Sequence, residues 1–421
     1  MDNNSTANYT AKNLSSEINW CYNNCKLQPC EGVVQEVCRK VIADYIFPSL
    51  SEWFFIVINL VLFTSGLVGN ALVCFVIWRS LQMHTVVNTF IFNLAFSDFL
   101  VILFCLPATL LQDVTETWYL GDTMCKIIPF IQTTSVSVSV LTLSAISVER
   151  YFAICQFWKV KPASKTLSCI LVIIWCVSCL ISIPHIVYMA EFHTFPESLT
   201  SLLTYCKIEM DEDHYLGYNM LKITMLYVLP VLIMTFTYSV ISRHLWKNEL
   251  PGVSEEDQRP GKFATKSGPE SQMRSRRRAA KMLITIVAVF VICFFVVHLI
   301  HVLRSFELVN KISDENVHIM IMLSHALVYL SSAVNPIIYN FMSAKFRKEF
   351  RVALSCCRKG RRLVFRPPQY TTSSTRNRGS IPRGSIPRSE RFTMNTYTNK
   401  HGWFVASGIL KKAVMQQDKY D

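Results

Sequence analysis

The sequence predicts an all-α membrane protein, a seven-transmembrane helix bundle with its N-terminus outside the cell. Three observations support this prediction: an apolar composition, seven apolar segments of membrane-crossing length, and basic residues confined to alternate loops. Of the 421 residues, 51% are hydrophobic and 17% are charged, whereas soluble domains carry about 25% charged residues. Much of the chain is therefore expected to lie in lipid.

The seven apolar segments match the thickness of a bilayer, whose core of about 30 Å needs roughly 20 apolar residues in a helix. They cover residues 53–78, 87–111, 124–148, 167–189, 218–242, 281–303 and 318–342. Proline inside several of them is compatible with membrane helices, because neighbouring groups satisfy the freed carbonyl. Buried helices of a soluble protein, the alternative, do not suit seven successive segments of this length.

The orientation follows from the charges of the loops, since Lys and Arg mark the cytoplasmic side of a membrane protein. The loops after the first, third, fifth and seventh segments are basic, as at 274–278 and Lys345, and the other loops are acidic. An odd number of spans then places the N-terminus outside. These loops and the tail also explain the formal net charge of +13, so this charge does not indicate binding to nucleic acid.

The segment 1–52 is expected to be extracellular and glycosylated. It contains no signal-peptide pattern of a basic start, an apolar core and a small-residue cleavage site. Asn-x-Ser/Thr acceptor sequences begin at Asn3, Asn4, Asn8 and Asn13, and the first two overlap. We therefore predict glycosylation at Asn4, Asn8 and Asn13.

Four cysteines precede the first apolar segment, on the oxidising side of the membrane, and they allow three disulfide connectivities. Apolar residues at helical spacing within 31–45 predict a short amphipathic helix, tied by disulfides, that covers the ligand. A zinc cluster is disfavoured, because no histidine lies nearby and the compartment is oxidising. The four cysteines are Cys21, Cys25, Cys30 and Cys38.

Asp98 lies in the middle of the second apolar segment. An ionisable residue at the membrane centre costs roughly 2.5–3.5 kcal/mol on insertion scales, so it requires polar partners. Asn70 in the first segment, Ser139 in the third and Asn335 in the seventh are candidates. A sodium ion held by Asp98 and a hydrogen-bonded core aspartate are both compatible with this pattern.

Two motifs lie at the cytoplasmic ends of spans. Glu149-Arg150-Tyr151 ends the third segment. The glutamate can hold Arg150 in an ion pair, and release of this pair exposes the arginine to a partner protein. Alternatively, Arg150 only extends its charged end from the apolar segment to the membrane surface. Asn335-Pro336-x-x-Tyr339 lies in the last segment, where Pro336 removes one backbone donor and loosens the helix.

With these motifs, residues 53–357 resemble the rhodopsin-like G-protein-coupled receptors. The resemblance implies a disulfide between Cys125 and Cys206, a plasma-membrane location, and a heterotrimeric G protein, an arrestin and receptor kinases as partners. The family usually has a proline where Val296 stands, so the sequence does not predict whether the sixth helix bends. The activation switches implied are Glu149, Arg150, Tyr238, Phe294, Asn335, Pro336 and Tyr339.

Several short stretches narrow this resemblance. They are residues 45–48, 52–53, 105–109, 113–118, 129–144 and 324–329. Together they look like the orexin receptors and the invertebrate allatotropin receptors, and Ile-Phe-Pro at 46–48 favours the allatotropin receptors. The implied ligand is a small neuropeptide with an amidated C-terminus. The alternative is a receptor for another amidated peptide, of the neuropeptide-Y-like or RFamide group.

The cavity residues follow from the same resemblance. Gln132 stands where amine receptors would carry an aspartate, and its neutral amide suits a peptide. His185, Lys222 and His301 replace a Gln, a Phe and an Asn of the orexin receptors, so the ligand preference of those receptors does not transfer. For His325, a hydrogen-bonded core histidine is the alternative. The full set is Pro107, Pro129, Gln132, Thr133, Val136, His185, Lys222, Tyr227, His301, His325 and Tyr329.

The chain beyond the seventh segment is expected to remain at the inner membrane surface. Apolar residues among Lys and Arg at 344–357 predict an amphipathic helix on lipid. Cys356 and Cys357 follow as candidates for palmitoylation, with free thiols as the alternative. Residues 358–421 are rich in Ser, Thr, Arg and Pro and predict a disordered cytoplasmic tail. Phosphorylation of this tail by kinases would add negative charge for an arrestin-type partner, and a plain solvated tail is the alternative.

The sequence motifs of other functional classes are missing from this sequence. It contains no glycine-rich phosphate loop, no paired catalytic acids and no His–Cys metal spacing, so no enzyme and no cofactor is expected, apart from the sodium ion considered above. A light sensor would need a lysine in 318–342, which has none. A channel or transporter is the remaining alternative, although the internal repeats of transporters are not evident.

Overall fold

The computed structural model describes residues 17, 20–21, 33–155, 164–195, 202–247, 269–305 and 314–359. The predicted glycosylation sites, Cys25, Cys30 and the tail from residue 360 lie outside these ranges. Within the helices, the side chains of His301, Cys356 and Cys357 also lie outside the described part.

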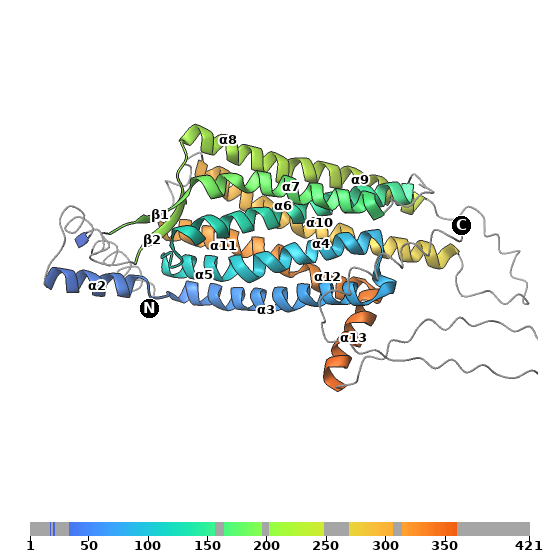
Figure 1. Ribbon diagram of the computed structural model, residues 1–421, viewed down its shortest axis with the longest axis horizontal. Coiled ribbons are helices and arrows are strands. Elements are labelled where there is room, and N and C mark those ends of the chain that lie inside the picture. The colour runs from blue at the N-terminus through green and yellow to red at the C-terminus, as the bar shows by residue number, and fades with distance from the viewer. Residues whose placement is uncertain are drawn as a thin grey trace, which may run out of the picture. The chain divides into compact units, whose positions relative to one another are not determined.

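Within these ranges, seven helices are long and apolar enough to cross a membrane, which confirms the predicted bundle (Figure 1). Two of them, the second and the fifth, each consist of two α-helices joined by a π-helical turn. Beyond the apolar segments, most of these helices continue by a turn or more into their polar flanks. The membrane-crossing helices are Leu50–Arg79, Val86–Thr115, Gly121–Cys155, Lys165–Tyr188, Glu212–Leu245, Arg276–Ile300 and Asn316–Met342.

The elements follow one another in a simple order. The bundle consists of α3 (Leu50–Arg79), α4 (Val86–Leu100), η2 (Val101–Cys105), α5 (Leu106–Thr115), α6 (Gly121–Cys155), α7 (Ser164–Tyr188), α8 (Glu212–Ile223), η3 (Thr224–Val228), α9 (Leu229–Lys247), α10 (Pro269–Ser305), α11 (Asp314–Ala333) and α12 (Asn335–Met342). Outside it lie α2 (Val33–Tyr45), η1 (Leu81–Met83), the strands β1 (Met189–His193) and β2 (Thr204–Ile208), and α13 (Ala344–Lys359).

Helix α6 is the centre of the bundle, because it packs against α4, α7 and α9. Contacts of α9 with α10, α10 with α11 and α11 with α3 complete the ring of helices. The first membrane-crossing helix, α3, begins with a capping box. The Ser49 hydroxyl accepts a hydrogen bond from the Glu52 backbone N–H, and the Glu52 carboxylate accepts one from the Ser49 backbone N–H. This cap fixes the point at which the chain enters the bundle.

Prolines account for the irregular turns within the spans. A proline has no N–H, and its ring collides with the carbonyl of the fourth residue before it. The π-turns η2 and η3 end just before Leu106-Pro107 and Leu229-Pro230, so the extra residue of each turn relieves this collision. At Pro336 the helix is interrupted instead, between α11 and α12.

Helix α10 has no such irregularity. It is assigned as one continuous α-helix that includes Val296, at the position where the family usually has its proline.

A β-hairpin lies at the outer end of the bundle (Figure 1). Its antiparallel strands pair Glu191 with Cys206, and the disulfide between Cys125 and Cys206 fastens it to α6, as predicted. A second contact joins the hairpin to the loop after α5, where the Trp118 backbone N–H donates to the Thr204 carbonyl at 2.7 Å. The hairpin is thus fixed at two points at the outer end.

Helix α2 confirms the amphipathic helix expected within 31–45. A disulfide joins Cys21 to Cys38, which selects one pairing for these two cysteines. Both sulfur atoms lie in a small buried cluster with Ile42, Phe195 and Leu203. Because Phe195 and Leu203 flank the hairpin strands, the N-terminal segment packs on the outer loop.

The first and last spans approach each other closely at glycine residues of α3. A Cβ atom added at Gly69 would lie 2.8 Å from Cβ and 2.9 Å from Cγ of Pro336, which real Cβ atoms essentially never do. The proline ring is rigid, so the contact cannot relax by rotation of a side chain. Gly69 therefore sets the distance between α3 and α12.

We expect Gly69→Ala to lower the unfolding temperature of the purified protein and its surface expression, since overpacking costs about 1–3 kcal/mol. Gly217→Ala is the matched control, because a Cβ there meets nothing within 4 Å. Alanine raises helix propensity by about 1 kcal/mol at both positions, so the difference between the two variants isolates the contact. Equal unfolding temperatures would contradict the close approach.

Candidate functional site

A polar group lies in the outer half of the bundle and brings together three predicted cavity residues. The Thr133 hydroxyl on α6 and Nε2 of His185 on α7 are 2.9 Å apart. The His185 ring contacts the edge of the Tyr218 ring on α8, with centroids 5.8 Å apart, and Nζ of Lys222 lies 4.5 Å from the centre of that ring. Tyr218 was not predicted, since a tyrosine near the outer end of a span is unremarkable in sequence.

His298 on α10 is a second residue that the sequence did not reveal as part of this group. Its ring lies 5.0 Å from the ring of Tyr227, a predicted cavity residue whose hydroxyl donates to the Val291 carbonyl at 3.2 Å. The Nε2 atom of His298 is buried and has no hydrogen-bond partner among the described residues. The sequence feature that could have identified His298 is the presence of a histidine within an apolar span.

The predicted cavity residues of α11 form a separate group with α5. Nδ1 of His325 lies 2.8 Å from the carboxylate of Asp113, which was not predicted. Tyr329 is buried, with 1% of its surface exposed, and its hydroxyl donates to Thr109 at 2.7 Å. In this conformation a ligand would reach the Tyr329 hydroxyl by displacing the Thr109 contact.

The remaining predicted cavity residues differ in exposure. Pro107 is exposed, whereas Pro129, Gln132 and Val136, which all lie on α6, are partly buried. Of these, Val136 lines a small internal cavity together with Asp98. The side chain of His301 is not among those that the structure describes.

Asp98 is buried in the middle of the bundle and connects three helices. Its Oδ1 atom accepts from Ser139 on α6 at 3.0 Å, and its Oδ2 atom accepts from Asn335 on α12 at 2.8 Å. Asn70 lies on the neighbouring helix α3, but its amide donates to the carbonyls of Gly66 and Ser332.

Asp98 and Ser139 are the residues that would hold the predicted sodium ion. The adjoining cavity has a volume of about 20 Å³, and its lining includes the oxygen-bearing residues Asp98, Ser139 and Asn335 beside apolar side chains. Hard cations prefer oxygen ligands, so the donor set and the size fit one small ion or one water molecule.

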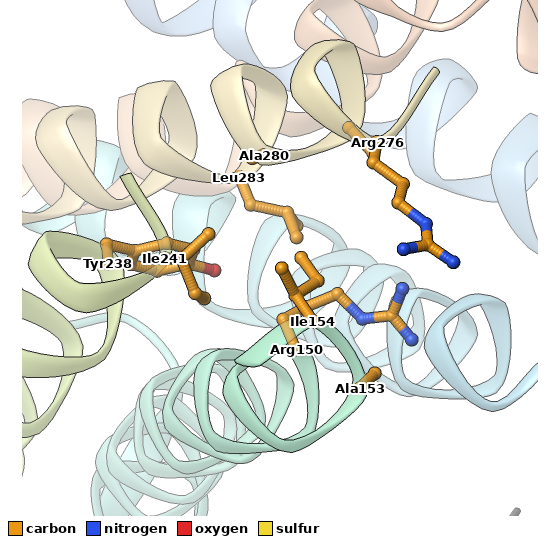
Figure 2. A pocket seen from close by; sticks show the side chains of 9 residues that line it. Arg150, Ala153, Ile154, Tyr238, Ile241, Arg276, Ala280 and Leu283 are labelled. Carbon is orange, nitrogen blue, oxygen red and sulfur yellow. The ribbon is translucent and has the colours of Figure 1, made fainter. Parts of the chain in front are cut away.

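At the cytoplasmic end, Arg150 is held by its neighbour in sequence. Its Nε atom donates to Glu149 at 2.5 Å and its terminal nitrogen donates to the second carboxylate oxygen at 2.6 Å. Arg150 also lines a pocket of about 300 Å³ between α6, α9 and α10, together with Tyr238 (Figure 2). In Figure 2 the guanidinium groups of Arg150 and Arg276 lie at the same end of this pocket.

A neighbouring arginine joins the cytoplasmic ends of two helices. The guanidinium of Arg277 on α10 donates two hydrogen bonds, of 3.1 and 2.8 Å, to the carbonyl of Leu245 near the end of α9. A carbonyl in the last turn of a helix has no partner within its own helix. Arg277 therefore satisfies this group and holds α10 against α9.

Tyr339 and Phe294 are buried switch candidates. Within the described ranges the Tyr339 hydroxyl has no hydrogen-bond partner, and its ring stacks on Phe346 of α13 with centroids 5.3 Å apart. Phe294 packs on Phe290 with centroids 4.7 Å apart and on His298 with centroids 6.1 Å apart. A row of rings along α10 thus runs from the outer polar group to the cavity beside Asp98, which Phe290 and Phe294 also line.

Comparison with known proteins gives consistent matches over most of the chain. Residues 69–339 match the family described as "7 transmembrane receptor (rhodopsin family)". The chain is 33% identical to a QRFP-like peptide receptor of Branchiostoma floridae over 325 residues, which are 76% of this chain and 81% of that protein. It is 31% identical to bombesin receptor subtype-3 of Ovis aries over 337 residues, which are 78% and 79% of the two chains.

Proposed function

This chain belongs to the rhodopsin family of seven-transmembrane, G-protein-coupled receptors and is not an enzyme, and from this membership we propose that it is a receptor for a peptide. The observation that carries the proposal is the polar group of Thr133, His185 and Lys222 inside an apolar bundle. Polar residues within a membrane are costly and mark binding sites by default. A peptide, rich in amide donors and acceptors, suits such a group.

The class of peptide is a finer question. The sequence resemblance to allatotropin and orexin receptors gives one candidate. The two relatives, named for QRFP-like peptide and for bombesin, favour the other candidate, a receptor for another amidated peptide such as one of the RFamide or neuropeptide-Y-like group. We therefore favour a receptor for another amidated peptide over an allatotropin or orexin receptor. Family membership removes the channel or transporter alternative.

In the mechanism that we propose, the peptide enters below the hairpin and contacts Gln132 and the two polar groups. It shifts the bundle between two packings, because it binds one of them more tightly. In the favoured packing α10 moves away from α9, the Glu149–Arg150 pair opens, and the pocket lined by Arg150 and Tyr238 accepts a heterotrimeric G protein. Phe294, Asn335, Pro336 and Tyr339 rearrange between the two packings.

The remaining assignments are proposals of the same kind. The receptor lies in the plasma membrane, with an extracellular segment 1–52, a bundle at 53–343, an inner amphipathic helix at 344–357 and a tail at 358–421. The tail is phosphorylated by receptor kinases and binds arrestin. The modified residues are Asn4, Asn8 and Asn13, by glycosylation, and Cys356 and Cys357, by palmitoylation.

A peptide panel tests the function. In cells that express the receptor with a promiscuous G protein, we expect calcium release with one of the QRFP-type, bombesin-type, allatotropin-type or orexin-type peptides. Gln132→Ala and His325→Ala should weaken the response at equal surface expression, by about 10-fold for a lost hydrogen bond to a charged or amide group. Silence of the surface-expressed receptor toward every peptide would contradict the proposal.

Removal of the Arg277 contact should favour the signalling state. Without two hydrogen bonds between α10 and the Leu245 carbonyl, we expect Arg277→Ala to raise ligand-independent signalling by a few-fold, since such bonds contribute roughly 0.5–1.5 kcal/mol each. Arg278→Ala, at an exposed neighbouring position, is the control for loss of charge. If both variants signal at the wild-type level without ligand, Arg277 does not restrain α10.

A further inference from the structure

Lys222 is a cation within the fifth membrane-crossing helix, Glu212–Leu245. It lies about 15 Å along the helix from Glu212, the outer end of α8, at a rise of 1.5 Å per residue. Among the residues that the structure describes, no carboxylate forms an ion pair with it. Its ammonium instead faces the Tyr218 ring, at 4.5 Å from the ring centre.

Two histidines with unused nitrogen atoms lie on the helices beside this lysine. His185 on α7 contacts the same Tyr218 ring as Lys222, and His298 on α10 lies 5.0 Å, between ring centres, from Tyr227 on the same span as Lys222. Nδ1 of His185 and Nε2 of His298 are buried and have no hydrogen-bond partner in the part of the chain that the structure describes. Since Nε2 of His185 is occupied by Thr133, a neutral His185 can present its Nδ1–H as a donor.

The chemistry of this group selects its ligand. A cation–π contact attracts a lysine but leaves its positive charge uncompensated, and a charge within a membrane protein is almost always paired or faces a functional cavity. Three nitrogen atoms from three helices, one of them cationic, can together surround a carboxylate and donate hydrogen bonds to its two oxygens. A ligand ammonium would be repelled.

On the basis of the peptide-receptor function above, we propose that Lys222, His185 and His298 form a subsite for a carboxylate of the peptide. The carboxylate belongs either to an Asp or Glu side chain of the peptide or to a free C-terminus. Because Lys222 lies on α8 and His298 on α10, this carboxylate joins the two helices. His298 packs on Phe294, so occupation of the subsite acts on the row of rings that leads to Asp98.

Matched peptides and receptor variants test the subsite. The most potent peptide of the panel is synthesised as the C-terminal amide, as the free acid, and as the amide with every Asp and Glu replaced by Asn and Gln. We expect Lys222→Met to weaken a carboxylate-bearing form by about 30-fold or more, and Lys222→Arg to retain most of the potency. The neutral form should be weak on the wild type and should lose nothing further on Lys222→Met.

The three forms distinguish the source of the carboxylate. A potent amide that weakens when Asp and Glu are replaced indicates a side chain, and a free acid more potent than the amide indicates the C-terminus. Lys126→Met is the control, because it removes a lysine of the outer bundle that is already paired with Asp122. Equal loss of potency in Lys222→Met and Lys126→Met, or full potency of the neutral form on the wild type, would overturn the subsite.

A measurement without peptide keeps the subsite testable even if the panel is silent and the peptide-receptor proposal fails. An uncompensated cation destabilises the empty bundle, so purified Lys222→Met should unfold at a higher temperature than the wild type. A lower unfolding temperature, with Lys222→Arg restoring the wild-type value, would show that the ammonium is a structural partner within the fold, and the subsite would be discarded.

Discussion

The bilayer offers no water to buried polar groups, and the arrangement of this receptor follows from the need to satisfy them within the bundle. Asp98 is the clearest case, because its two oxygens accept from Ser139 on α6 and from Asn335 on α12. A carboxylate shared in this way fixes the rotation of three helices at once. Gly69 complements it, since the missing side chain lets α3 approach Pro336 on the same helix as Asn335.

Satisfied and unsatisfied polar groups divide the molecule into fixed and movable parts. The outer hairpin is covalently attached to α6 through Cys125 and Cys206, and is therefore a fixed feature of the ligand entrance. By contrast, Tyr339 and His298 each have a buried polar atom without a partner among the residues that the structure describes, which raises the energy of this packing. Both lie on helices that we propose to rearrange, so less stabilisation is lost when this packing changes.

Short motifs and local patterns were sufficient to predict much of this structure. The seven spans, the Glu149–Arg150 pair and the contact of Asn335 with Asp98 all follow from motifs or from apolar length. The partners of His325 and Lys222 did not follow, because they depend on the rotation of each helix. Asp113 and His325 are 212 residues apart, and the π-turns η2 and η3 each add a residue that rotates the following helix by about 100°. Periodicity alone does not reveal such a turn.

In the mechanism proposed above, a peptide bound at the outer polar groups opens the inner pocket beside Arg150. The most direct measurement is the distance between spin labels introduced at Lys165 and Arg274, exposed positions at the cytoplasmic ends of α7 and α10. With an activating peptide, this distance should lengthen by several ångströms, on the order of one helical turn or less, because α10 moves outward. An unchanged distance in a receptor that activates its G protein would contradict the account.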